Sequence, residues 1–238
     1  FKGKYYVYFG PLPVLFFYIP YKLITNCYPP DVLSILFFIS LGFIANFFLL
    51  FKIRNKYFSF VPEYKFIFSI FILGFAGGKI FLLTNPYVYE VAITSAFCLM
   101  SIAIYYLYEC IENNYNYKDV FIFSLSLSLS VAGRPHFVLI CLWLFPVILS
   151  RILNNSPKDQ KLTSSVALIL PAVSIGSLLG LYNYLRFGSI FDFGHYWQLS
   201  LNNIKILYQD IMRFDQIARN IYYSGYYYFI QPFEIMLQ

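Results

Sequence analysis

The chain has 238 residues, of which 60% are hydrophobic and only 12% are charged, whereas about 25% of residues in soluble domains are charged. Together with a mean hydropathy of +0.64, this composition excludes an ordinary soluble domain and predicts an integral membrane protein. The formal charge of +6 is spread along the chain, which disfavours nucleic acid as a partner and favours anionic lipid or phosphate.

The first predicted element is a shaped loop over residues 1–13, FKGKYYVYFGPLP. Two lysines and the aromatic rings of Tyr5, Tyr6, Tyr8 and Phe9 precede Gly10-Pro11-Leu12-Pro13, in which each proline removes a backbone donor and restricts the residue before it. Aromatic rings with lysines are typical of a membrane–water interface, and they also suit a sugar or phosphate ligand. From this chemistry alone the interfacial interpretation is favoured. Residues 11–25 are too short to span a membrane, and we expect them to lie on its surface.

Charge-free runs predict the membrane spans. Val32–Phe51 contains 20 residues, which as a helix is about 30 Å long and matches the hydrocarbon core of a bilayer. Phe66–Thr84 is the second predicted span, and we expect the side chain of its Lys79 to snorkel toward the interface. The other two long runs are Val91–Tyr108 and Leu162–Leu185.

Residues 120–150 hold two uncharged runs of 14 residues, Val120–Gly133 and Phe137–Ser150, separated by Arg134-Pro135-His136. One continuous helix places Arg134 near the middle of the membrane, at a cost of about 2.5–3.5 kcal/mol. Two short helices place it at an interface, although each is short for a full span. The charges of the loops decide between the two arrangements.

With a helical hairpin, eight Lys and Arg residues lie in the loops on one side of the membrane, and the turns between spans on the opposite side hold three, Lys79, Arg134 and Arg186. The larger group is Lys52, Arg54, Lys56, Lys65, Lys118, Arg151, Lys158 and Lys161. Positive charge accumulates on the cytoplasmic side, so the hairpin is favoured. We therefore predict six membrane segments, with residues 1–30 and 186–238 outside the cytoplasm.

The fold class predicted is all-α: one polytopic helical membrane bundle with interfacial helices. Residues 1–30 form a loop and an interfacial helix, 31–185 the bundle, and 186–238 a second loop, with an interfacial helix over 202–222. Position 1 is Phe, and Gln238 closes an apolar-aromatic stretch, so we expect the chain to be a piece of a longer protein, truncated at both ends.

Small and polar residues inside the predicted spans are interpreted as packing features. Four serines alternate with leucine over residues 124–130, and in a helix we expect their hydroxyls to bond to carbonyls one turn earlier. Gly176 and Gly180 form one GxxxG motif. The four cysteines have no metal-ligand spacing and are predicted to be packing residues.

No sequence signature of a soluble enzyme occurs, such as a phosphate-binding glycine loop, HExxH or paired cysteines. All eleven Asp and Glu residues lie at segment ends, in loops or in the terminal stretches. A proton- or ion-coupled transporter usually keeps a carboxylate near the middle of the membrane, so this distribution disfavours a transporter.

Polar residues converge instead on the predicted outer side. They are Lys4 and the tyrosines of the first loop, Glu90, Arg134, His136, Arg186, Asp192 and His195. Each has a simpler explanation when taken alone: Glu90 suits a helix start, Arg134 an interfacial anchor, and the histidines structural hydrogen bonds. Together they are compatible with a site for an anionic, lipid-linked substrate.

Four stretches carry a resemblance to a known family: GKYYVYFGPLP (Gly3–Pro13), NPYVYEVAI (Asn85–Ile93), AGRPHFVL (Ala132–Leu139) and YNYLRFGSIFDFGHYWQLS (Tyr182–Ser200). In this order the chain resembles bacterial multi-spanning glycosyltransferases of the GT-C superfamily, related to protein mannosyltransferases. The resemblance implies an enzyme of the bacterial inner membrane. Such an enzyme moves a sugar from a polyprenyl-phosphate carrier to a glycan, lipid or protein acceptor at the outer face.

The resemblance also implies roles for particular residues. In that family an acidic catalytic residue begins the first loop after an initial span, so we expect the catalytic acid, and any divalent cation bound with it, upstream of this chain. By position Glu90 matches the acid that opens a later outer-face span, and Arg134 is the expected contact for the carrier phosphate. The substrate-binding residues expected from this comparison and from the outer-side clustering are Lys4, Tyr6, Tyr8, Glu90, Arg134 and His136.

An alternative function remains open from the residues alone. A non-catalytic polytopic membrane protein, such as a lipid-carrier flippase or a subunit of an envelope-polysaccharide complex, would have the same composition and spans. An Asp soon after one preceding span, in sequence upstream of this chain, would favour the transferase.

Overall fold

The computed structural model describes residues 10–75, 79–84, 86–194 and 214–229, and most of these residues are helical. No strand occurs in these ranges, which confirms the predicted all-α class. The chain divides into two compact units, residues 9–193 and a second unit of residues 1–8 with 194–238, and each is described by itself.

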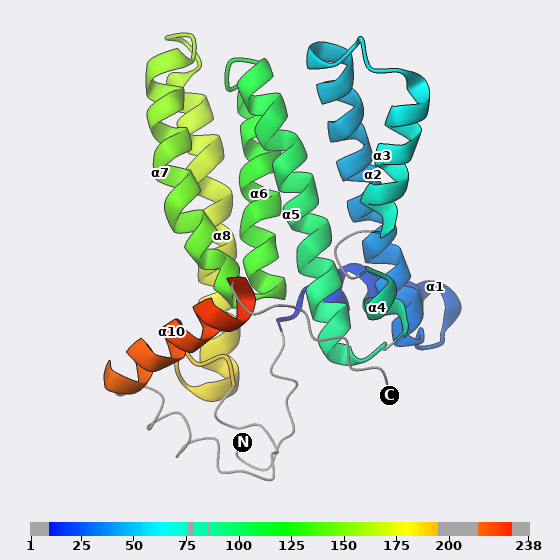
Figure 1. Ribbon diagram of the computed structural model, residues 1–238. Helices are drawn as coiled ribbons and strands as arrows, with labels where there is room; N and C mark the ends of the chain where they lie inside the picture. The colour runs from blue at the N-terminus through cyan, green and yellow to red at the C-terminus, as the bar shows by residue number, and fades with distance from the viewer. Residues whose placement is uncertain (1–9, 76–78, 85, 195–213, 230–238) are drawn as a thin grey trace. The chain divides into compact units, whose positions relative to one another are not determined.

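The larger unit is a bundle of long helices joined by short turns (Figure 1). It begins with the π-helical turn η1 (Val14–Tyr18) and α1 (Ile19–Thr25). The following elements are α2 (Asp31–Tyr57), α3 (Glu63–Phe75), α4 (Lys79–Thr84), α5 (Val88–Glu112), α6 (Tyr117–Gly133), η2 (Pro135–Phe137), α7 (Val138–Asn155) and α8 (Lys161–Phe187).

Four stretches of the described chain are helical, long and apolar enough to cross a membrane. They are Asp31–Tyr57, Val88–Glu112, Pro135–Asn155 and Lys161–Phe187. These helices, like the composition, indicate a membrane protein.

The predicted hairpin is present. α6 ends at Gly133, Arg134 has an extended backbone with φ −142° and ψ 106°, and α7 begins at Val138. Both helices are longer than the uncharged runs that predicted them, with 17 residues in α6 and 18 in α7. They reach about 25–27 Å because the charged residues at their far ends, Lys118 and Arg151, are helical as well.

The predicted span Phe66–Thr84 is divided into two helices, α3 and α4, on either side of residues 76–78, which lie outside the described residues. The sequence there contains Gly77 and Gly78, and glycine is a poor helix former. The expected snorkelling of Lys79 is wrong. Its side chain is buried, its ammonium donates to the Leu73 carbonyl and lies 5.5 Å from the centre of the Phe97 ring.

The core of the bundle is built from α2, α5, α6, α7 and α8. α5 packs against α2 on one side and α6 on the other, and α6 packs in turn against α8 (Figure 1). The largest apolar cluster is formed by side chains of α5, α6, α7 and α8, with Phe123, Leu127, Ile152 and Leu168 almost completely buried. This packing fixes the end of α6 next to the start of α5.

Hydroxyl groups link these helices in a way that differs from the prediction. Ser130 Oγ bonds within α6 to the Leu127 carbonyl at 2.7 Å, as expected, but Ser124 Oγ donates across to the Leu168 carbonyl of α8. Ser164 Oγ of α8 likewise donates to the Tyr115 carbonyl at 2.8 Å. Two of these serines therefore connect segments that are far apart in the sequence.

The close helix approach also lies elsewhere than the GxxxG motif indicates. A Cβ built at Gly176 meets nothing within 4 Å, whereas one at Gly42 would lie 2.7 Å from Phe97 and 3.2 Å from the Cys98 Cα. Gly42 thus allows α2 to approach α5 closely. The cysteines behave as predicted where they are in helices of the bundle, since Cys98, Cys110 and Cys141 are buried; Cys27 is exposed.

The second unit contains α10 (Phe214–Phe229). It overlaps the helix predicted over residues 202–222 only from Phe214 onward, and residues 195–213 lie outside the described residues. Ala218 and Ile221, which belong to the predicted apolar side of this helix, are exposed within this unit, as an interfacial helix requires.

Candidate functional site

The turn between α6 and α7 is built by local hydrogen bonds and by a close helix contact. The Arg134 amide donates to the Ser130 carbonyl at 2.9 Å, and the Phe137 amide donates to the Arg134 carbonyl at 3.1 Å. A Cβ at Gly133 would lie 3.1 Å from the Ala96 Cβ, so the end of α6 packs directly on α5. This arrangement positions Arg134 beside the first turn of α5.

The guanidinium of Arg134 is held by Tyr89. Its Nη2 donates to the Tyr89 carbonyl at 3.1 Å, and its Cζ lies 3.9 Å from the centre of the Tyr89 ring. A cation over an aromatic face is attracted by the ring quadrupole, and both contacts restrict the side chain to one orientation. Arg134 is therefore a positioned cation at one end of an apolar bundle.

Glu90 follows Tyr89 in the first turn of α5. Its Oε2 is buried and has no hydrogen-bond partner among the described residues. The positive end of the helix dipole stabilises a carboxylate at this position, which supports the structural interpretation of Glu90. A buried carboxylate oxygen without a donor is nevertheless unfavourable, so a donor supplied by a ligand would stabilise it.

The first loop reaches the same place. A Cβ at Gly10 would lie 1.5 Å from the Ala132 carbonyl oxygen, so only glycine allows the chain to pass the end of α6 here. Leu12, two residues further on, is 1% exposed and anchors this part of the loop. Gly10, Glu90 and Arg134 thus lie at the same end of the bundle, and we call this group the Arg134 site. The residues of the first loop that were predicted to converge here lie outside the described residues.

The remaining predicted residues are placed as follows. His136 is exposed, and its ring packs against Phe137 with 4.7 Å between ring centres. Arg186 lies over the rings of Tyr182 and Phe187 in its own helix, at 4.6 and 4.7 Å. Lys4, Tyr6, Tyr8 and His195 lie outside the described residues.

A polar network at the other end of α5 was missed by the sequence analysis. Lys52 of α2 pairs with Glu109 of α5, and Lys56 pairs with Glu112. Asn113 extends the network by donating to Asp119 at 2.8 Å. The signal in the sequence is a pair of lysines and a pair of glutamates, each spaced by about one helical turn near the ends of two predicted spans.

The two polar ends of α5 are separated by the thickness of a bilayer. Glu90 and Glu109 are nineteen residues apart in one continuous helix, which corresponds to about 29 Å. The hydrocarbon core is about 30 Å thick. The Arg134 site and the lysine–glutamate network are therefore spaced like the two surfaces of a membrane.

Comparisons of the chain with protein-family models, with curated proteins and with solved structures find no match. Within the described residues, no group of three or more His, Cys, Asp and Glu side chains is arranged to hold a metal ion.

Proposed function

We propose that this protein is an integral membrane glycosyltransferase that moves a sugar from a polyprenyl-phosphate carrier to an envelope acceptor, at the outer face of a bacterial inner membrane. The observation that carries the proposal is the guanidinium of Arg134, held by Tyr89 at one end of an apolar helical bundle. A lipid phosphate carries its charge at the membrane surface, which is where this end of the bundle would lie, and its hydrocarbon chain lies beside the helices.

The chemistry of the Arg134 site fits a phosphate ligand. An arginine fork binds two phosphate oxygens at once, whereas lysine offers a point charge. The contacts with Tyr89 orient the guanidinium before a ligand arrives, which lowers the entropic cost of binding. Glu90 supplies an acceptor for a sugar hydroxyl through Oε2, which has no donor among the described side chains. The catalytic acid is not assigned to any residue of this chain.

A second function is favoured by the same contacts interpreted differently. Arg134 bonded to a carbonyl and stacked on a ring is also what an interfacial anchor does. In that case the protein is a non-catalytic polytopic membrane protein, such as a lipid-carrier flippase or a subunit of an envelope-polysaccharide complex.

Binding of undecaprenyl phosphate to Arg134→Ala and Arg134→Lys variants of the full chain separates the two. A charge-assisted hydrogen bond contributes about 1.5–3 kcal/mol, so alanine should weaken binding about tenfold to 150-fold. Lysine should restore only part of the affinity, because it lacks the fork.

Arg54, in the last turn of α2, provides a matched control because it lies at the opposite end of the bundle from Arg134. Its Nη2 donates to the Val61 carbonyl at 3.3 Å, and its Cζ lies 4.9 Å from the Phe66 ring centre, so its contacts are of the same kind. Arg54→Ala should lower the melting temperature without changing undecaprenyl phosphate affinity. If Arg134→Ala behaves like Arg54→Ala, Arg134 is an anchor and the proposed phosphate site is wrong.

A further inference from the structure

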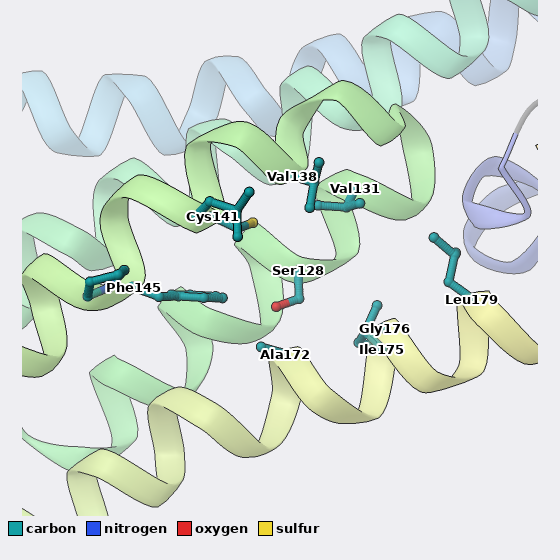
Figure 2. A pocket seen from close by; sticks show the side chains of 11 residues that line it. Ser128, Val131, Val138, Cys141, Phe145, Ala172, Ile175, Gly176 and Leu179 are labelled. Atoms are coloured by element: carbon teal, nitrogen blue, oxygen red, sulfur yellow. The ribbon is translucent and has the colours of Figure 1, made fainter. Parts of the chain in front are cut away.

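A cavity of about 360 Å³ lies between α6, α7 and α8, apart from the Arg134 site (Figure 2). Its walls are almost entirely apolar and include Cys141 and Phe145 of α7 and Ala172 of α8. The volume is within the range of small-molecule sites, about 300–1,000 Å³. It is also more than twice that of an engineered apolar cavity of roughly 150 Å³ that stays dry and binds benzene.

One polar atom faces this cavity without a partner. Ser128 is 5% exposed, and its Oγ has no hydrogen bond within the part of the chain that the structure describes. Its neighbours on α6 differ, since Ser124 donates to the Leu168 carbonyl and Ser130 to the Leu127 carbonyl. Figure 2 places Ser128 between the side chains contributed by α7 and those contributed by α8. A buried hydroxyl without an acceptor is unfavourable, so a ligand that brings an acceptor oxygen to Ser128 Oγ would stabilise this part of the structure.

The surroundings of the cavity indicate where that ligand comes from. Only 17% of the apolar window in Pro135–Asn155 and 22% of that in Lys161–Phe187 is buried, so most residues of both windows lie on the outside of the bundle, where lipid would surround a membrane-spanning helix. A side chain added at Gly176 on the cavity wall meets no atom within 4 Å. The molecules available to fill this space are therefore membrane lipids.

The depth of Ser128 narrows the class of lipid. Ser128 lies five residues before the last residue of α6, which is about 7.5 Å below the end of the helix. Since α6 is about 25 Å long and the hydrocarbon core about 30 Å thick, this end of the helix is near the interface. The ester carbonyls of glycerolipids lie at that interface and accept hydrogen bonds, so a glycerolipid seated about 7.5 Å deeper than its neighbours brings one of them to Ser128 Oγ. A polyprenyl chain has no acceptor at that position.

We propose that the cavity binds one acyl chain of a membrane glycerolipid, whose ester carbonyl accepts a hydrogen bond from Ser128 Oγ. The chain passes Cys141 and continues toward Phe145, deeper in the membrane. This site is separate from the phosphate site proposed at Arg134, and neither depends on the other.

Native mass spectrometry of the full chain in mild detergent tests this site with three probes: dioleoyl phosphatidylglycerol, its diether analogue, and undecaprenyl phosphate. The ester lipid should bind one molecule per chain. The diether should bind about two- to twelvefold more weakly, the equivalent of one hydrogen bond of about 0.5–1.5 kcal/mol. Ser128→Ala should abolish that difference.

Gly176→Leu should fill the cavity and weaken binding of the ester lipid at least tenfold, while raising the melting temperature of the lipid-free protein. Ser177→Leu is the matched control, because Ser177 is the next residue of α8, is exposed and does not line the cavity. It should leave binding unchanged.

Equal affinity of the parent protein for ester and diether lipids would overturn the proposal. So would bound undecaprenyl phosphate that is lost in Gly176→Leu, which would assign the cavity to the polyprenyl chain. If Gly176→Leu does not fold, the ester–diether difference in the parent and its loss in Ser128→Ala decide the matter, since Ser128 makes no hydrogen bond in the described structure that alanine would remove.

Discussion

Replacing Gly10 by alanine should displace the first loop from the end of α6. The added methyl group would lie 1.5 Å from the Ala132 carbonyl oxygen and 2.6 Å from its carbon, both of them backbone atoms. Non-bonded Cβ atoms do not approach closer than 3.0 Å, so one of the two segments must move by about 1.5 Å. The backbone of Gly10 is not in the left-handed region, so the contact alone causes the effect.

Overpacking of this kind costs about 1–3 kcal/mol. For a chain of this size that corresponds to a fall in melting temperature of about 2–12 °C. Gly10→Ala should therefore melt lower than the parent in a thermal-unfolding assay in detergent. It should also bind undecaprenyl phosphate more weakly, because the loop leaves the Arg134 site.

Gly176→Ala serves as the control, because its methyl group meets nothing within 4 Å. Alanine in a helix is favoured over glycine by up to about 1 kcal/mol, so this variant should melt at the same temperature or higher. If Gly10→Ala also melts at or above the parent temperature, the close approach of Gly10 to Ala132 is absent and the convergence of the first loop on the Arg134 site is refuted.

Three further predictions address topology, the polar network and pH. Single cysteines at the exposed positions Asn55 and Lys158 should resist an impermeant thiol reagent in intact cells while one at Ser189 reacts; the opposite pattern would invert the topology. In double-mutant cycles the more exposed pair Lys56–Glu112 should have a coupling energy of less than about 1 kcal/mol. The pair Lys52–Glu109, whose glutamate side chain is 12% exposed, should have a larger coupling energy, and equal values for the two pairs would contradict this. Burial, together with a hydrogen bond to Asp31, raises the pKa of Tyr18 above its ordinary value of 10.0, so the stability that the Tyr18 hydroxyl contributes is present below pH 10 and is lost as the pH rises through the folded-state pKa. Tyr18→Phe should accordingly flatten the alkaline side of a melting-temperature profile, and an unchanged profile would exclude Tyr18 as its cause.

The hairpin was predictable from the sequence because two independent signals agreed. Gly133 and Pro135 disfavour a continuous helix, and the positive charges of the loops gather on one side of the membrane only if the chain turns back at Arg134. The division of Phe66–Thr84 was not predicted, because the average hydropathy of an apolar run does not reflect the low helix propensity of Gly77 and Gly78. A charge count likewise cannot show that Lys79 is held by the Leu73 carbonyl.

Contacts between helices were the hardest feature to predict. The rule that serine bonds to its own helix holds for Ser130, but Ser124 finds a carbonyl of α8, and a local rule contains no partner helix. The glycine motif predicted close packing at Gly176, whereas the close contact is at Gly42. For the candidate site, chain order and predicted topology placed Glu90 and Arg134 at the same end. The contacts between Tyr89 and Arg134, and the close approach of Gly10 to Ala132, become visible only in the three-dimensional structure.

The spacing of charges along α5 has a consequence for the membrane around the protein. A helix with Glu90 at one end and the Lys52–Glu109 pair at the other resists sliding along the bilayer normal, since any shift draws one polar end into hydrocarbon. α5 therefore fixes the height of Arg134 relative to the lipid headgroups. A thicker bilayer must either compress around the protein or submerge the guanidinium, at a cost of fractions of a kcal/mol for each Å of mismatch. The phosphate binding proposed at Arg134 should consequently weaken as the acyl chains of the host membrane lengthen, and the length of a single helix would then make ligand affinity depend on bilayer thickness.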